Sequence, residues 1–314
     1  MKKIAFHANQ LGLRGTEVAL YAYAKYNEEI LGNKSVICIT PDRELTTLPK
    51  FQERFEIAWV GWSEYGHYLP ENNFDYLYAL KMGTIDGGCV DVVPTLVHVV
   101  FRHNQPHGHK YVYVSDWLAE DQGYKKETHS VPHICERLPE PSQDLRSVLG
   151  ISKNKTVFGC YAGETEFNIG FVHDVIKRTV EERSDIEFIF MNITPFANHP
   201  RIHFLPGNYD LKYKSSFVEA CDAMIHARVG GETFGLAVAE FTLSNKPVIT
   251  YALSGERCHL DILGERAILY QGYEDFYDII NDFPNYNTRN DYYLAYKDYS
   301  PEIIMEKFNR IFLS

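Results

Sequence analysis

Residues 226–251 have the sequence HARVGGETFGLAVAEFTLSNKPVITY, and this stretch decides how the second half of the chain folds. Apolar residues precede it and Pro247 to Tyr251 form a β-prone run, so the pattern predicts strand, loop, helix, turn and strand. Glu232 and Thr233 follow Gly230-Gly231 and are suited to cap the helix, whose positive end then faces the loop. A helix start of this kind favours binding of phosphate.

One carboxylate is unusual within the predicted helix. Glu240 is the only charged residue from Phe234 to Leu243, and its neighbours are mostly small and apolar. Burial of a carboxylate without partners is costly, so Glu240 is expected to bind something. The alternative is that Gly-Gly is an ordinary loop and that Glu240 lies on the one wetted edge of its helix.

The spacing of Glu232 and Glu240, with Phe-Gly following the first, resembles the Glu-x7-Glu signature of retaining glycosyltransferases of the GT-B class, particularly family 4. This resemblance implies an α/β fold of two Rossmann-like parallel-sheet domains that face a central cleft. It also implies that a nucleotide diphosphate sugar, the donor, binds mainly to the second domain and that the acceptor binds mainly to the first.

Length and composition fit a folded protein with two domains. The chain has 314 residues, of which 45% are hydrophobic and 23% are charged, enough for two cores. A net charge of -11 argues against a general nucleic-acid binder. The six cysteines form no Cys-x-x-Cys pair, the first residues lack a signal-like apolar core, and no apolar run is long enough to span a membrane. The expected location is the cytoplasm.

The first half begins in the manner of a Rossmann-like sheet. Lys3 to Ala8 is a predicted strand, Thr16 to about Leu31 a helix, and Ser35 to Thr40 the next strand. The family resemblance implies that the glycine loop between the first two elements faces the cleft, which makes Gly12, Arg14 and Gly15 candidates. Alternatively, Arg14 is an ordinary solvated loop residue.

His98 lies inside the apolar run 95–100, and three more histidines follow in the next loop. A metal site is not predicted, because no carboxylate or cysteine accompanies them at ligand spacing. In the family a histidine at the end of this strand points toward the transferred sugar, so the resemblance makes His98 a catalytic candidate. The alternative is a core histidine bonded to a backbone carbonyl.

Two domains are predicted, residues 1–140 on the acceptor side and 151–299 on the nucleotide-sugar side. In the second half, strands are expected at 156–160, 186–191 and 202–205 and helices at about 169–183 and 213–221, an alternation typical of a parallel α/β layer. Residues 300–314 form an amphipathic helix with proline in its first turn. In GT-B proteins such a helix often returns to the first domain.

The resemblance assigns a role to each residue of the central stretch. Glu240 binds the ribose hydroxyls, because a carboxylate offers two acceptor oxygens to a vicinal diol. Glu232 binds hydroxyls of the transferred sugar and is the second catalytic candidate. The remaining donor-binding candidates hold the diphosphate by their backbone or border it: Thr233, Phe234, Gly235, Leu236 and, in the loop after the first strand of the second domain, Gly163.

One departure from the family concerns the charge that faces the donor phosphates. The family commonly carries an Arg and a Lys in the loop after the first strand of the second domain, whereas residues 161–170 read YAGETEFNIG. Arg228 is the favoured replacement, with Lys212 or Lys214 as further candidates. The alternatives are that Arg228 forms a structural salt bridge and that the two lysines are solvated.

The predicted function is metal-independent transfer of a sugar, with retention, from a nucleotide diphosphate sugar to a glycan, a glycoconjugate or a small hydroxyl acceptor. UDP- or GDP-linked donors are favoured, and no bound cofactor is expected. The main alternative is a degenerate GT-B protein that binds a nucleotide sugar or a partner without turnover. A sugar-nucleotide epimerase is a third possibility, and a dehydrogenase is disfavoured because no acidic residue ends an identifiable second strand.

Overall fold

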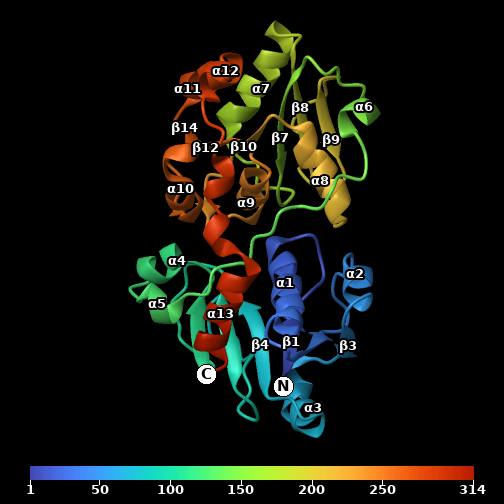
Figure 1. The fold of residues 1–314 in the computed structure, drawn as a ribbon, viewed down its shortest axis with the longest axis vertical. Helices are drawn as coiled ribbons and strands as arrows, with labels where there is room; N and C mark the ends of the chain where they lie inside the picture. The colour runs from blue at the N-terminus through green and yellow to red at the C-terminus, as the bar shows by residue number, and fades with distance from the viewer. The chain divides into compact units, whose positions relative to one another are not determined.

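The computed structural model describes residues 1–314, which divide into two compact units. The first unit comprises Met1–Ile134 together with Tyr299–Ser314, and the second comprises Cys135–Asp298. Each is built on one six-stranded sheet whose strand pairs are all parallel (Figure 1). No helix is both long and apolar enough to cross a membrane.

The first sheet has the spatial order β3-β2-β1-β4-β5-β6. Its strands are β1 (Lys3–Ala8), β2 (Lys34–Ile39), β3 (Glu56–Trp59), β4 (Tyr76–Lys81), β5 (Thr95–Val99) and β6 (Lys110–Tyr113). The helices of this unit are α1 (Gly15–Glu29), α2 (Leu48–Gln52), α3 (Tyr65–Glu71), α4 (Asp116–Asp121), α5 (Lys126–His129) and α13 (Pro301–Phe312), with a 3-10 turn η1 (Trp62–Glu64). The inner strands are apolar almost throughout because both faces of the sheet are covered.

The second sheet has the order β14-β12-β10-β7-β8-β9. Its strands are β7 (Thr156–Tyr161), β8 (Ile186–Met191), β9 (Ile202–Leu205), β10 (Ala223–His226), β12 (Val248–Tyr251) and β14 (Ala267–Tyr270). A separate pair joins β11 (Gly231–Glu232) to β13 (Glu256–Arg257). The helices are α6 (Leu145–Leu149), α7 (Gly170–Glu182), α8 (Leu211–Ala220), α9 (Leu236–Leu243), α10 (Cys258–Leu263), α11 (Tyr273–Asn281) and α12 (Phe283–Tyr286), with 3-10 turns η2 (Gly264–Arg266), η3 (Tyr292–Leu294) and η4 (Lys297–Tyr299).

The last helix, α13, packs on the first unit although it follows the second in sequence (Figure 1). The ring of Phe308 is fully buried and stacks on Tyr23 of α1, with 5.5 Å between ring centroids. The Lys307 ammonium donates to Asp116 at 2.9 Å and to Ser130 at 2.8 Å. Apolar burial and these charge-assisted bonds together hold the helix.

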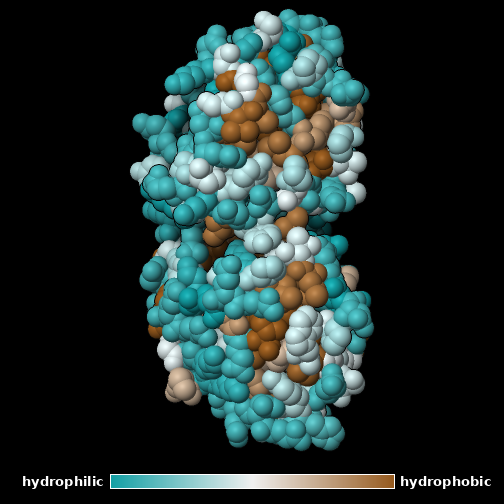
Figure 2. Space-filling view, turned by 90° about the vertical axis from the view of Figure 1, so that its right-hand side faces the viewer, coloured by the Kyte–Doolittle hydropathy of each residue, from teal (hydrophilic) through white to brown (hydrophobic).

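Apolar side chains are exposed in patches on one face of the molecule. Figure 2 shows a mostly hydrophilic face with brown patches in each unit. Single exposed apolar side chains are normal for folded proteins, so these patches alone identify no binding surface.

The N-cap of α4 offers a local test of stability in the first unit. The buried Ser115 hydroxyl accepts from the Leu118 N–H at 3.1 Å. The Ser115→Ala variant is expected to lose about 1 kcal/mol of unfolding free energy, since that N–H loses its partner. Urea unfolding followed by tryptophan fluorescence measures the loss, because all three tryptophans lie in this unit. The exposed Ser63→Ala is the control, and equal midpoints for the two variants would contradict the capping role.

Candidate functional site

The carboxyl ends of β7 and β10 form the topological switch point of the second sheet. The chain passes from β7 to β8 on one side, and β10 returns to pair with β7 on the other. In open parallel sheets, ligands bind outside such strand ends. The last residue of β7 is Tyr161 and the last of β10 is His226, and both contact a glutamate of the central stretch.

Glu240 has two partners from other elements. Each carboxylate oxygen accepts from the Lys214 ammonium of α8 at 3.0 Å, and one also accepts from the Tyr161 hydroxyl. The Glu240 and Lys214 side chains are only 13% and 11% exposed. Their mutual pairing explains how an apolar helix tolerates a carboxylate.

Glu232 is held in place by its backbone and by two side chains. Gly231 and Glu232 pair with Glu256 and Arg257 in the two-residue sheet. His226 Nε2 lies 3.3 Å from Glu232 Oε1, and the Arg228 guanidinium donates to Oε2 at 3.0 Å. Burial alone would raise the pKa of Glu232, but the His226 hydrogen bond and the positive charge of Arg228 outweigh it and lower this pKa to about 2.

Two glycines are required by the backbone of this loop. Gly231 has a φ of +77°, and a Cβ there would lie 2.1 Å from the carbonyl oxygen of Glu256. Gly235 has a φ of +96°, and its Cβ would lie 3.1 Å from that of His259. Both positions are in the left-handed region, where L side chains are strained.

The helix of the central stretch begins later than the sequence suggested. Glu232 belongs to β11 and Thr233 precedes the helix, so neither is its N-cap. Gly235 takes that position and has no side chain that could accept from the first turn of α9. The first backbone N–H groups, starting at Leu236, are therefore left to a ligand or to water, whereas the neighbouring Phe234 side chain is buried.

Arg228 is paired with carboxylates on both sides. Besides Glu232 it contacts Glu166, with Nε 2.6 Å from Oε2. Glu166 follows Gly163 in the loop after β7, and Asn168 of the same loop accepts from the Val229 N–H at 2.9 Å. This arrangement fits the salt-bridge alternative for Arg228. Of the two lysine candidates, Lys212 is exposed, whereas Lys214 is the one that reaches a carboxylate.

His98 lies in the core of the first unit. It is fully buried, with Nδ1 at 2.7 Å from the Tyr78 hydroxyl and Nε2 at 2.8 Å from the Val131 carbonyl. Its environment is that of the core histidine stated as the alternative, and burial lowers its pKa well below the usual value. A side chain with no exposed surface has no direct path to a substrate in this conformation.

The first sheet has its own switch point, between β1 and β4. His7 lies near the end of β1. Its Nε2 is 2.8 Å from Asn9 Oδ1, and its Nδ1 is 2.7 Å from the Tyr65 hydroxyl. Lys81 ends β4, pairs with Asp86, and places its ammonium 5.0 Å from the centre of the Trp62 ring. Sequence reasoning missed these groups because only the sheet order brings the two strand ends together.

The glycine loop after β1 lies at the same edge. Gly12 is buried under Glu44, whose carboxylate oxygen is 2.6 Å from the position of a Cβ at residue 12. Arg14 is exposed and is the N-cap of α1, which begins at Gly15. These candidates therefore share an edge of the sheet with His7 and Lys81.

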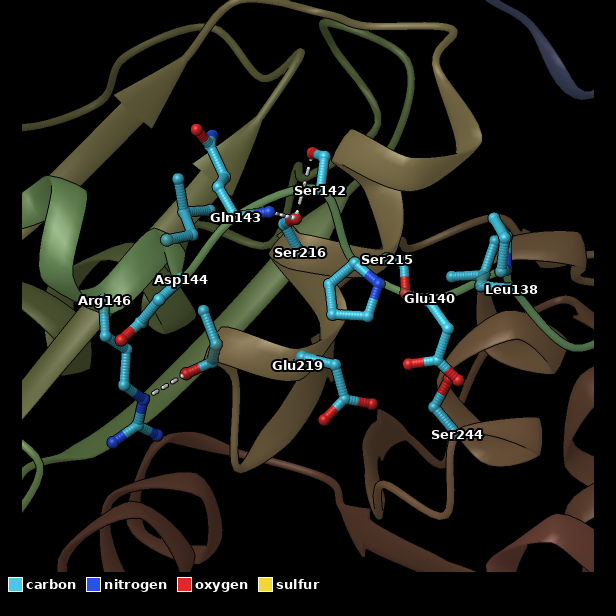
Figure 3. A pocket seen from close by; sticks show the side chains of 14 residues that line it. Leu138, Glu140, Ser142, Gln143, Asp144, Arg146, Ser215, Ser216, Glu219 and Ser244 are labelled. Atoms are coloured by element: carbon cyan, nitrogen blue, oxygen red, sulfur yellow. Dashed lines mark hydrogen bonds between the residues drawn. The ribbon is translucent and has the colours of Figure 1, made fainter.

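A polar pocket of about 650 Å³ lies elsewhere in the second unit (Figure 3). It borders Ser244 at the end of α9 and Glu219 at the end of α8, and its lining also includes residues 138–146. Helices that follow parallel strands end at the amino edge of the sheet, opposite the strand ends that bind ligands. Neither Glu232 nor Glu240 lines this pocket.

No group of three or more histidine, cysteine, aspartate or glutamate side chains is arranged to hold a metal ion. No protein-family model matches the chain, and no curated protein matches it.

Several solved structures share its fold over nearly the whole length. HepE of Anabaena in complex with UDP and glucose aligns with a TM-score of 0.73 at 16% identity, covering 100% of both chains. A glycosyltransferase from Rickettsia africae aligns with a TM-score of 0.73 at 13% identity, covering 99% of this chain and 98% of the other. A putative UDP-N-acetylglucosamine 2-epimerase from Listeria monocytogenes aligns with a TM-score of 0.61 at 12% identity, covering 98% and 94%.

The chain therefore has the GT-B fold, which confirms the predicted fold class. The neighbours include glycosyltransferases and an enzyme described as an epimerase, and identities of 12–16% define the fold alone.

Proposed function

We propose that this protein is a retaining glycosyltransferase that takes a sugar from a nucleotide diphosphate donor, UDP-linked in preference to GDP-linked. The observation that carries the proposal is the position of two oriented carboxylates at one switch point. Glu240 contacts the end of β7, and Glu232 contacts the end of the neighbouring β10. HepE of Anabaena, which has a similar fold, is described in complex with UDP, and this favours uridine as the base.

Each carboxylate has a separate role in the proposal. Glu240 accepts from the ribose hydroxyls, which exchange with the Tyr161 hydroxyl as donors to this carboxylate when the nucleotide binds. Glu232 accepts from hydroxyls of the transferred sugar and stays ionised at neutral pH, in keeping with its lowered pKa. Neither residue is proposed as a covalent nucleophile, because the leaving phosphate assists the incoming hydroxyl on the same face.

The electrostatics of the site bear on the donor phosphates. Glu166, Glu232 and Glu240 are three carboxylates, and Arg228 and Lys214 are two cations, so these five side chains carry a net charge of minus one. We infer that the diphosphate is held mainly by backbone N–H groups at the start of α9, where the helix dipole favours an anion. Arg228 and Lys214 contribute only as members of their ion pairs.

The acceptor is proposed to bind at the switch point of the first sheet. The half-buried Trp62 offers an aromatic face there, and the exposed Arg14 of the neighbouring glycine loop offers a cation, whereas His7 and Lys81 are buried and position Trp62 from below. Aromatic faces and charged hydrogen-bond donors suit sugar hydroxyls and rings. The acceptor class remains a glycan, a glycoconjugate or a small hydroxyl compound.

The test is incubation of the protein with UDP-, GDP- and ADP-sugars, with and without EDTA, followed by measurement of released nucleotide diphosphate. Release from a UDP-sugar that survives EDTA and is lost in Glu232→Gln is the expected result. The anomeric configuration of the product, read by NMR, tests retention, and an inverted product would contradict that part.

Two rival functions are separated by the same assay. The pairing of both cations with carboxylates favours a module that binds the nucleotide sugar without turnover. Tight UDP binding with no release from any donor would support this module. Conversion of the donor to its epimer without free nucleotide diphosphate would instead support an epimerase.

A further inference from the structure

A chain of hydrogen bonds leads from Glu232 into the core of the second unit. His226 Nε2 faces Glu232 Oε1 at 3.3 Å, and His226 Nδ1 lies 3.0 Å from the Thr250 hydroxyl. The same hydroxyl lies 3.1 Å from His259 Nε2. His259 is fully buried, and its Nδ1 has no hydrogen-bond partner. Thr250 thus connects two histidine rings whose centroids are 4.5 Å apart.

The carboxylate at one end sets the direction of every hydrogen bond in this chain. An ionised carboxylate only accepts, so His226 Nε2 must carry the proton and, in the neutral ring, Nδ1 is an acceptor. The single Thr250 hydrogen is then donated to His226, which requires His259 to donate from Nε2 to the Thr250 oxygen. His259 Nδ1 is left as a bare lone pair, and this fits its lack of a partner.

The reverse direction is disfavoured on two grounds. It would place a buried, unpaired N–H at His259 Nδ1, and an unsatisfied buried donor costs about 1–3 kcal/mol. A second proton on either ring would also place a positive charge close to the other ring, since the two centroids are 4.5 Å apart. Burial and the neighbouring His226 lower the pKa of His259 well below its usual value, so the His259 ring stays neutral in this arrangement.

We propose that Thr250 and His259 are positioning residues that act through His226. Their hydrogen bonds fix the imidazole with its Nε2–H directed at Glu232, and thereby fix the direction of the carboxylate. The two-residue sheet supports the same geometry, because Glu232 pairs with Arg257, two residues before His259. The effect on turnover rests on the proposed glycosyl transfer, whereas the hydrogen-bond direction is a property of the protein alone.

The Glu232→Gln variant makes a sharp test because Arg228 can only donate. The amide oxygen of Gln must face Arg228 Nη1, which leaves the amide N–H₂ to face His226 Nε2. That nitrogen must then accept, and the whole chain reverses. His226 donates from Nδ1, Thr250 donates to His259 Nε2, and the proton of His259 moves to Nδ1, although His259 does not contact residue 232 in the chain.

The measurement is ¹⁵N NMR of histidine-labelled protein, in which protonated and unprotonated ring nitrogens resonate far apart. In the wild type, both His226 and His259 are expected to carry the proton on Nε2. In Glu232→Gln, both are expected to carry it on Nδ1. In Glu232→Gln/Thr250→Val, His259 should no longer follow residue 232, because valine keeps the volume of threonine but removes the connecting hydroxyl.

Turnover provides the second test. Thr250→Val is expected to lower kcat about tenfold with less than a twofold change in donor KM, since a misdirected carboxylate harms the transition state more than ground-state binding. The matched control is Thr242→Val, because Thr242 is also fully buried but bonds only to carbonyls of its own helix, at 3.0 and 3.1 Å.

The outcomes are decisive in each arm. Protonation of His226 at Nδ1 in the wild type, or an unchanged His259 in Glu232→Gln, would overturn the proposed chain. If Glu232→Gln does not fold, the wild-type spectrum still decides the hydrogen-bond direction. Equal kcat for Thr250→Val and Thr242→Val would overturn the positioning role. Absence of turnover by the wild type would contradict the proposed function. The NMR measurement would still test the direction of the hydrogen bonds, because it does not depend on turnover.

Discussion

The Glu240→Ala variant is expected to lose about 3–5 kcal/mol of unfolding free energy in the second unit. The loss arises because Lys214, only 11% exposed, keeps its charge in a site where its carboxylate partner has been removed. The Tyr161 hydroxyl loses its acceptor as well. Amide hydrogen exchange in β8 measures the change, because that fully buried strand belongs to the second unit and tryptophan fluorescence reports the first.

A double variant separates stability from binding. In Lys214→Met/Glu240→Leu both charges are replaced by apolar groups, so most of the lost stability is expected to return. Donor binding should not return, because no carboxylate remains for the ribose hydroxyls. Calorimetric titration with UDP measures this, and at least a tenfold weaker Kd is expected from the loss of charged hydrogen bonds worth about 1.5–3 kcal/mol.

The stability prediction and the binding prediction fail separately. A stable Glu240→Ala protein would mean that Lys214 finds solvent or another partner at little cost. Wild-type affinity for UDP in the double variant would remove Glu240 from the ribose site while leaving its structural pairing intact.

Local pattern was sufficient to predict most strands, for a physical reason. Strands buried on both faces are nearly continuous apolar runs, and the runs 3–8 and 186–191 coincide with β1 and β8. The run 202–205 coincides with β9, a partly exposed strand at the edge of its sheet. Alternation of such runs with helical segments then predicts a parallel layer structure. The parallel α/β layers could therefore be predicted from local pattern, whereas the GT-B class was implied by the resemblance that Glu232 and Glu240 carry.

The candidate site depended on contacts that no local pattern encodes. The sequence placed the helix start near Thr233, which was wrong. Gly231 and Glu232 pair instead with β13, and this pairing joins residues more than twenty positions apart, so no local pattern reveals it. The partner of Glu240 is similarly distant: Lys214 lies on another helix, two residues after the exposed Lys212. Spacing identified the two glutamates, but charge pairing in the folded chain decides which cations are open to a ligand.

The last prediction concerns Glu232 and acid. Its pKa is lowered from 4.5 to about 2 in the folded protein, so the unfolded chain binds more protons between these values. Stability from Glu232 is therefore complete above about pH 4.5 and is lost as the pH falls toward 2. The contribution is about 3 kcal/mol at neutral pH, an order-of-magnitude value for a side chain that is 26% exposed.

The measurement compares wild type with Glu232→Gln by hydrogen exchange in β8 at pH 6 and pH 3.5. The stability difference between the two proteins is expected to shrink by about 1 kcal/mol or more over this interval, because the wild type loses the ionic part and the amide does not titrate. The exposed Glu140→Gln in the same unit should differ from wild type by the same small amount at both pH values. A pH-independent difference for Glu232→Gln would show that Arg228 and His226 do not stabilise an ionised carboxylate there, and would weaken the assignment of this group as the acceptor for sugar hydroxyls.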